Sequence, residues 1–363
     1  MSDDVTGNIS ALQHFSTGDG PGIRTTVFFK GCSLRCTWCH NPETQETAPD
    51  LMFFLQLCTA CGRCVTACPA SAHCLTEESV DVWAELAIVG EEQAGLASLK
   101  SQMESDVARH MLHEIDRSLC HQCGACVAVC PSEALQLNGM EVSLETVMQF
   151  VLADQDFYRT SGGGVTLSGG EPLLQPDFCT ALARSCKENG IHVIIDTAGQ
   201  VPWGAFEKVI PYTDTFYFDL KGACVEDYHQ ETGGDFDLIL TNLARLVAAG
   251  AHVVACIVII PGLNDDLAAN ERLSDVLTSA GVSEVRLLAY HQLGRSKYQA
   301  LGRDYPSEQS SRDRSVKADS SALNGMRSTR TALFDGKVKP PDLAEINTLL
   351  AFYARSFSAW LDG

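Results

Sequence analysis

Three cysteines near the start of the chain constrain it more than any other feature. Cys32, Cys36 and Cys39 have the spacing C-x3-C-x2-C and follow an apolar segment, residues 25–30, that is typical of a β-strand. A four-iron cluster normally takes four cysteine ligands, so three cysteines would leave one iron open. By analogy with zinc, an open position indicates a catalytic rather than a structural site. The spacing favours a 4Fe–4S cluster that holds a substrate, with a structural zinc site and three unrelated core cysteines as alternatives.

Composition and charge exclude several other classes. The 363 residues carry a net charge of −20, which argues against a nucleic-acid partner, because phosphate contacts need clustered Lys and Arg. Residues 1–4 are acidic and no apolar segment follows them, so no signal peptide is expected. The chain has no run of eighteen apolar residues, so no membrane span is expected either. Tight C-x2-C runs among the sixteen cysteines favour a cytoplasmic metal-binding enzyme over a disulfide framework.

Two further cysteine runs repeat one pattern between residues 58 and 131. Each reads C-x2-C-x2-C-x3-C-P, the bacterial ferredoxin run, in which the fourth cysteine binds the other cluster. Paired zinc knuckles are the alternative, but zinc does not need the doubled pattern with proline after each last cysteine. The spacer 75–119 has no functional interpretation, and its segments 80–89 and 103–115 look like amphipathic helices. The predicted ligand sets are Cys58, Cys61, Cys64 and Cys130 for one cluster and Cys120, Cys123, Cys126 and Cys68 for the other.

From residue 140 onward, predicted strands and helices alternate, which indicates a parallel sheet with helical crossovers. Together with residues 25–30 there are six strands, and six units fit an incomplete (β/α)6 barrel of class α/β. A flat, doubly wound sheet is the alternative. The predicted strands are residues 25–30, 165–168, 192–196, 215–220, 252–260 and 284–290, and the predicted helices are residues 144–153, 176–189, 203–210, 238–249 and 267–280.

This pattern predicts the following domains. The barrel spans residues 10–52 and 135–305, and a ferredoxin-like insertion spans residues 53–134, with its two cluster-binding runs at about 49–78 and 111–140. Residues 306–336 are rich in Ser and Arg and predict an insertion without stable structure. Residues 337–363 close the chain with an amphipathic helix over 342–360.

Polar, glycine or cysteine residues follow all six predicted strands. Because the chemistry of β/α barrels lies at the C-terminal strand ends, these residues predict one site on that rim. Ordinary strand-to-helix turns explain any one of them, but they explain all six together poorly. In chain order the residues are Cys32, Gly169-Gly170-Glu171, Asp196-Thr197, Asp219 with Lys221, Pro261-Gly262, and His291.

These motifs carry a family resemblance. The cysteine loop followed by Ser-Gly-Gly-Glu-Pro at 168–172 resembles the radical S-adenosylmethionine (SAM) superfamily. Longer stretches resemble the glycyl radical enzyme activating enzymes, and the two ferredoxin runs match the subgroup with that insertion rather than the shorter pyruvate formate-lyase activating enzyme. The resemblance covers about residues 10–305 and the region around 338–341. The stretches that carry it are residues 19–24, 39–43, 162–171, 219–221 and 287–294.

The resemblance implies an anaerobic oxidoreductase. A 4Fe–4S cluster on Cys32, Cys36 and Cys39 would cleave SAM reductively to methionine and a 5′-deoxyadenosyl radical, which takes hydrogen from a glycine of a partner glycyl radical enzyme. A reductant such as flavodoxin or ferredoxin would supply the electron. Beside Asp196, Thr197 and Asp219 the family places a monovalent cation. The implied SAM-binding residues are Trp38, Cys39, His40, Asn41, Gly169, Gly170, Glu171, Asp196, Thr197, Asp219, Leu220, Lys221 and His291.

One departure from the family bears on SAM binding. Cys256 stands where the family usually has arginine, so that contact is lost or comes from another residue, for which Arg286 is the candidate. Two other functions stay open at this stage. One is a radical SAM enzyme that modifies a small molecule, and the other is an electron-transfer protein that uses only the ferredoxin-like unit. The sequence does not identify the partner enzyme.

Overall fold

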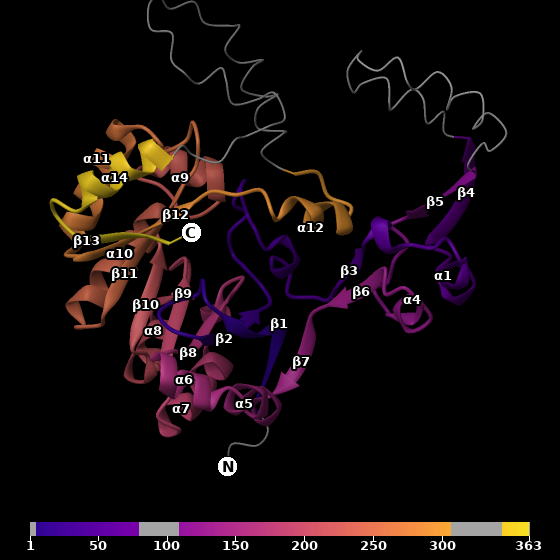
Figure 1. The fold of residues 1–363 in the computed structure, drawn as a ribbon, viewed down its shortest axis with the longest axis horizontal. Coiled ribbons are helices and arrows are strands. Elements are labelled where there is room, and N and C mark those ends of the chain that lie inside the picture. Colours follow the sequence, from indigo (N-terminus) through magenta and orange to yellow (C-terminus); the bar gives the residue numbers. More distant parts are fainter. Residues whose placement is uncertain (1–4, 80–108, 306–342, 363) are drawn as a thin grey trace, which may run out of the picture. The chain divides into compact units, whose positions relative to one another are not determined.

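The computed structural model describes residues 5–79, 109–305 and 343–362 (Figure 1). Contacts divide the chain into two compact units, one of Met1–Asp50 with Asn138–Gly363 and one of Leu51–Leu137. The predicted helix at 80–89 and the predicted insertion at 306–336 lie outside the described residues. Among those residues, no helix combines the length and apolar character that crossing a bilayer requires.

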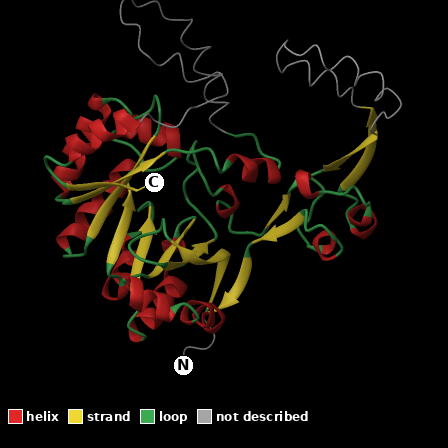
Figure 2. Ribbon diagram, viewed as in Figure 1, coloured by secondary structure: helices red, strands yellow, loops and turns green. Residues whose placement is uncertain are grey.

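A sheet, whose strands are yellow in Figure 2, forms the centre of the first unit. Among the described residues it has nine strands, in the order β13-β12-β11-β10-β9-β8-β2-β1-β7. From β2 through β8 to β13, each strand pairs in parallel with the next, while β1 pairs antiparallel with both β2 and β7. The parallel strands follow one another in chain order, without the reversal that defines a doubly wound sheet. The strands are β1 (Thr6–Ser16), β2 (Arg24–Phe29), β7 (Met140–Ser143), β8 (Gly164–Gly169), β9 (His192–Thr197), β10 (Thr215–Asp219), β11 (Val253–Ile259), β12 (Glu284–Ala289) and β13 (Ser358–Asp362).

Helices connect the parallel strands and cover one face of the sheet. Apolar residues from α5, α7, α8, α10 and α11 form the main core with Val27, Leu167 and Phe218 of the sheet, all of which are fully buried. Several helices begin at a capping side chain, as in α10, where Asp235 accepts a hydrogen bond from the backbone N–H of Leu238. The helices of this unit are α5 (Leu144–Leu152), α6 (Gln155–Ser161), α7 (Pro176–Glu188), α8 (Trp203–Val209), α9 (Val225–Thr232), α10 (Phe236–Ala248), α11 (Leu267–Ala280), α12 (Arg295–Ala300) and α14 (Leu343–Tyr353).

The opposite face of the sheet carries the site. Side chains alternate between the two faces of a strand, so Ile194, Tyr217, Val254 and Cys256, which form a separate small cluster, point away from the helical core. Asp196 and Asp219 lie two residues beyond Ile194 and Tyr217 and therefore share this inner face.

The structure corrects the sequence-based prediction at both ends of the sheet. The closing helix predicted over 342–360 ends at Tyr353, and residues from Ser358 onward form β13, which pairs with β12. An open edge strand offers unpaired N–H and C=O groups, and this pairing outweighs the local helical pattern. The prediction also missed β1, in which buried and exposed residues are mixed and no long apolar run occurs.

The second unit is small and has two two-stranded sheets, β3 with β6 and β4 with β5. The helix predicted over 103–115 is wrong in its described part, because β5 pairs antiparallel with β4 there. A short helix lies inside each cysteine run and contains its third cysteine, Cys64 or Cys126. The elements are β3 (Asp50–Phe53), β4 (His73–Ser79), β5 (Arg109–Ile115), β6 (Leu135–Asn138), α1 (Arg63–Ala67) and α4 (Ala125–Ala128).

Candidate active site and iron–sulfur centres

A cavity of about 290 Å³ lies in the first unit, where the parallel strands β2 and β8 to β12 end. It brings together eleven of the predicted site residues, which come from four different segments of the chain. Arg286, Cys256, Asp19 and Ser168 line the same cavity. The eleven predicted residues are Cys32, Cys36, Trp38, Cys39, His40, Asn41, Gly169, Gly170, Asp196, Asp219 and Lys221.

The cysteine loop is held on both sides by backbone hydrogen bonds. The N–H of Gly31 donates to the carbonyl of Thr44 at 2.7 Å, and the N–H of Arg35 donates to that of Thr232 at 2.7 Å. Leu34 and Trp38 are buried against the cysteines and anchor the loop. Burial raises the pKa of Cys36 to about 12, so this thiol needs a bound metal to become a thiolate. Three sulfurs around one cavity are a soft donor set that suits an iron–sulfur cluster.

Two glycines bring the end of β8 close to the cysteine loop. Gly169 has a φ of +114°, and a Cβ there would lie 2.3 Å from the backbone nitrogen of Phe29. A Cβ on Gly170 would lie 2.2 Å from the carbonyl oxygen of Gly31. Only glycine allows this backbone approach, which leaves main-chain groups bare along the cavity wall.

Charged side chains line the far wall. Asp196 accepts a hydrogen bond from the hydroxyl of Ser168 at 2.7 Å, and Lys221 donates to Asp219 at 2.8 Å. Burial raises the pKa of Asp196, and the nearby Asp219 carboxylate adds to that effect. Burial opposes the charge of Lys221, but Asp219 and Cys36 raise its pKa above the ordinary value. Carboxylates and a buried ammonium group suit a ligand that carries both charges, as the methionine part of SAM does.

Arg286 is a cavity residue that lies next to Cys256. The two residues are register partners on β12 and β11, and both are at least nine-tenths buried. The guanidinium donates to the carbonyl oxygen of Gly18 at 2.5 Å and lies 4.8 Å from the ring centre of Tyr217. The resemblance implies an arginine at position 256, where this chain has cysteine. Arg286 places a guanidinium one strand away from that position.

Four predicted SAM-binding residues do not line the cavity. Leu220 and Thr197 are one residue out of phase with the inner face, and Leu220 packs in the main core. The carboxylate of Glu171 is buried and accepts hydrogen bonds from Thr197, from the N–H of Ala198 and from the N–H of Leu173. Glu171 therefore joins the ends of β8 and β9, and its role as a direct SAM contact stays a prediction.

His291, the fourth of these residues, is exposed and does not line the cavity. Its ring stacks on that of His40 at 4.0 Å between centres, and His40 lines the cavity. Burial lowers the pKa of His40 to about 4, and the neighbouring His291 ring adds to that effect. The His40 ring is therefore neutral. Sequence analysis missed Asp19 and Ser168 as lining residues, although their places in the quoted motifs were a signal.

The second unit gathers one predicted cluster set around one pocket. Cys58, Cys61, Cys64 and Cys130 line it together, which is the set that the crossed ferredoxin pattern predicts. His113 lines the same pocket, and sequence analysis missed this residue.

The other four cysteines, Cys120, Cys123, Cys126 and Cys68, lie in a backbone of the same shape. Ala60 and Gln122, each two residues after the first cysteine of its run, have φ values of 51° and 55°. Their N–H groups donate to the sulfurs of Cys58 and Cys120 at 3.4 Å in both cases. The two halves of the unit thus repeat one local fold.

Comparisons with known proteins show which family the chain belongs to. The Radical SAM superfamily model matches residues 130–270, and the 4Fe-4S binding domain and 4Fe-4S single cluster domain models match residues 113–136 and 18–87. The benzylsuccinate synthase activating enzyme of Thauera aromatica is 38% identical over 298 residues, which are 81% of this chain and 82% of that protein. The chain belongs to the glycyl radical enzyme activating enzymes. The (2S)-3-sulfopropanediol dehydratase activating enzyme of Klebsiella oxytoca is 34% identical over 311 residues, 84% of this chain and 88% of that protein.

Membership in the glycyl radical enzyme activating enzymes confirms the resemblance and the α/β radical SAM fold. It also confirms that 4Fe–4S clusters and SAM are the cofactors of this oxidoreductase. The isethionate sulfite-lyase activating enzyme of Desulfovibrio desulfuricans is 33% identical over 347 residues, 94% of this chain and 99% of that protein.

Proposed function

We propose that this activating enzyme generates a radical on a glycine of a partner glycyl radical enzyme. The observation that carries the proposal is the cavity in which the three cysteines of the C-x3-C-x2-C loop meet carboxylates, an ammonium group and a glycine-lined wall. When bound, the cluster supplies one electron to the sulfonium of SAM, which yields methionine and a 5′-deoxyadenosyl radical that takes hydrogen from the partner's glycine. Relatives named for several different glycyl radical enzymes support a protein substrate.

In this proposal the chain's own residues bind and orient SAM. Cys32, Cys36 and Cys39 hold the cluster, and the bare backbone at Gly169 and Gly170 accepts the amino group of the methionine part. Asp196 and Asp219 stabilise positive charge, either the ligand's own or that of a monovalent cation. The buried walls formed by Leu34 and Trp38 keep water away from the cysteines, which strengthens every charge interaction inside.

Arg286 supplies the guanidinium that position 256 lacks. It reaches the cavity from the strand next to Cys256. An arginine is suited to a carboxylate because its planar group donates two parallel hydrogen bonds. We assign it to the carboxylate of SAM, in place of the usual arginine.

The ferredoxin-like unit binds two further 4Fe–4S clusters that pass electrons from a cytoplasmic reductant such as flavodoxin or ferredoxin. The doubled cysteine run and the pocket that gathers Cys58, Cys61, Cys64 and Cys130 support this role. The partner's identity is a separate question, because relatives named for benzylsuccinate synthase, isethionate sulfite-lyase and choline trimethylamine-lyase are all 33–38% identical to this chain.

The decisive experiment mixes the reduced, reconstituted chain with SAM and each of several purified glycyl radical enzymes without oxygen. A glycyl doublet in the electron paramagnetic resonance (EPR) spectrum of one partner, with matching 5′-deoxyadenosine, is the expected result. The matched control is Cys36→Ala, which removes one cluster ligand and should yield neither. SAM cleavage that depends on a small molecule and leaves every partner without a radical would favour the small-molecule enzyme. No SAM cleavage at all would leave only electron transfer.

A further inference from the structure

Two histidines distinguish the two halves of the ferredoxin-like unit. His113 lies seven residues before Cys120, where the other half has Leu51 seven residues before Cys58. His73 lies fifteen residues after Cys58, where the other half has Leu135 fifteen residues after Cys120. A buried histidine pair therefore takes the place of a buried leucine pair.

The equivalence of these positions is structural as well as numerical. The N–H of Phe54 donates to the carbonyl of Ala134 at 2.8 Å, and the N–H of Asp116 donates to that of Ala72 at the same distance. Each donor lies four residues before the first cysteine of a run, and each acceptor lies fourteen residues after the first cysteine of the other run. The two halves thus share this backbone hydrogen bond, and the paired positions beside it carry histidines in one half and leucines in the other.

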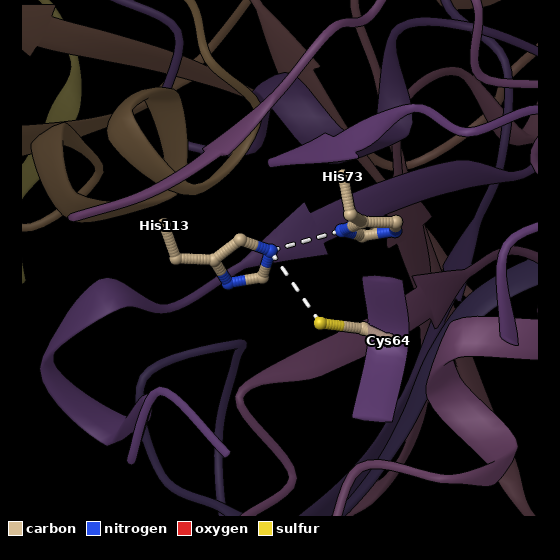
Figure 3. Close-up of side chains that lie close together, drawn as sticks. All are labelled: Cys64, His73 and His113. Atoms are coloured by element: carbon tan, nitrogen blue, oxygen red, sulfur yellow. Dashed lines mark hydrogen bonds between the residues drawn. The ribbon is translucent and has the colours of Figure 1, made fainter. Parts of the chain in front are cut away.

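The histidine pair lies against the sulfurs of one predicted cluster (Figure 3). Nδ1 of His113 is 3.5 Å from the sulfur of Cys58, and Nε2 is 3.5 Å from that of Cys64. Nδ1 of His73 is 2.9 Å from Nε2 of His113. An iron-bound cysteine sulfur has no proton, so any hydrogen bond here must be donated by the histidine. If His73 donates to Nε2, Nδ1–H of His113 points its proton at Cys58.

A second side-chain donor lies at the same cluster. The hydroxyl of Ser132 is 3.8 Å from the sulfur of Cys130, the fourth member of the set with Cys58. Its equivalent two residues after Cys68 is Ala70, which has no side-chain donor. Leu51 and Leu135 instead pack in one apolar cluster, together with cysteines of both sets: Cys120, Cys126, Cys64 and Cys130. Neither leucine offers a side-chain donor to any of these sulfurs. The histidine pair and the Ser132 hydroxyl both lie at the cluster that includes Cys58. Each of these donors stabilises the extra negative charge that the cluster gains on reduction.

We propose that His113, positioned by His73, donates a hydrogen bond to the cluster held by Cys58, Cys61, Cys64 and Cys130, and makes it the more easily reduced of the two. A hydrogen bond to a cysteine sulfur stabilises the reduced, more negative cluster and so raises its potential. The first cluster then retains an electron, and the second is the stronger donor. The inference rests on the two ferredoxin-type clusters of the proposed function.

The alternative occupant of this place is a single metal ion. Cys64, His73 and His113 have ligand atoms within 4.8 Å of one another, a set that could hold such an ion. However, Cys64 belongs to the four-cysteine set, so the ion and the cluster would compete for one sulfur. A test must therefore separate a histidine that donates from one that binds metal.

The first measurement is an EPR-monitored redox titration of the full chain, reconstituted without oxygen. Iron is counted beforehand, because about twelve per chain shows that all three clusters are present, and about four would end the ferredoxin claim itself. His113→Leu introduces the residue type that the other half has at the equivalent position, Leu51. It should lower the equilibrium constant for reduction of one ferredoxin-type cluster about tenfold, which is about 59 mV for a one-electron couple. His121→Leu, which removes an exposed histidine inside the second run, between Cys120 and Cys123, should shift neither cluster.

A second measurement takes its main result from the wild-type chain. Pulsed EPR of the reduced wild-type chain with ¹⁵N-labelled histidine should show a weak nitrogen coupling to one ferredoxin-type cluster, and His113→Gln should remove it. A strong coupling, typical of an imidazole bound to iron, would overturn the proposal, and so would the absence of coupling. An unshifted potential in iron-replete His113→Leu would overturn it as well.

Discussion

Gly170→Ala tests the glycine-lined wall of the cavity with a single methyl group. The new Cβ would lie 2.2 Å from the carbonyl oxygen of Gly31 and 2.7 Å from that of Thr44. Side-chain carbons do not approach closer than about 3.0 Å, so the backbone must move by about 0.8 Å. Both oxygens already accept hydrogen bonds, from the N–H of Glu171 at 2.8 Å and from the N–H of Gly31 at 2.7 Å.

The cost of this change follows from those contacts. Two backbone hydrogen bonds are worth about 1 kcal/mol each, and overpacking adds about 1–3 kcal/mol. These costs add to about 3–5 kcal/mol. If about half of this cost destabilises the SAM-bound state relative to the free protein, the free energy of SAM binding weakens by about 1.5–2.5 kcal/mol, which is roughly tenfold or more in affinity. The loop that moves leads directly into Cys32, so the yield of 5′-deoxyadenosine should fall with it.

The assay is equilibrium binding of SAM to the anaerobically reconstituted protein, with iron measured in the same sample. Gly204→Ala is the matched control, because nothing lies within 4 Å of a Cβ on Gly204, in α8. It should bind SAM as the wild type does. If Gly170→Ala retains full iron and binds SAM within about twofold of the wild type, the backbone of β8 does not form the wall of the site.

Other substitutions check the clusters, the SAM carboxylate and the sheet. Cys36→Ala should abolish the formation of 5′-deoxyadenosine, and 5′-deoxyadenosine from this variant would contradict the assignment of Cys36 to the SAM-binding cluster. Cys123→Ala should lose about four iron per chain and be reduced more slowly, yet keep SAM binding. Arg286→Leu should weaken SAM binding about tenfold at unchanged iron, and unchanged binding would exclude its proposed contact. Burial and Arg24 lower the pKa of His192, so its stabilising neutral form is present above pH 6.5 and lost as the pH falls. His192→Gln should reduce the loss of stability between about pH 7.5 and about pH 5.5, measured by urea unfolding, and an unchanged loss would refute it.

Sequence periodicity was sufficient for the repeating part of the first unit. The six predicted parallel strands are all present, and their order in the sheet follows the chain. The prediction was wrong where an edge or a hairpin decided the structure, at β13 and at β5. Pairing partners there are distant or separated by the spacer, and a local pattern contains no information about a free strand edge.

The candidate site divides in the same way. Spacing alone picked out Cys32, Cys36 and Cys39 and both ferredoxin runs, because ligand chemistry demands those residue types at short intervals. Spacing could not show that the Glu171 carboxylate, at the end of β8, accepts hydrogen bonds at the end of β9. It also could not show that His291 stacks on His40. Such roles depend on neighbours that are close only after folding.

The sequence by itself determined which groups can bind iron and which segments alternate as strand and helix, since both depend on residues a few positions apart. Only the tertiary structure decided which of the polar residues face one cavity. A strand turns successive side chains to opposite faces, so Asp219 reaches the cavity while Leu220 enters the core. The tertiary structure also placed Arg286 beside Cys256 and His113 beside two cysteine sulfurs. Only folding brings such distant segments of the chain close enough for their side chains to interact.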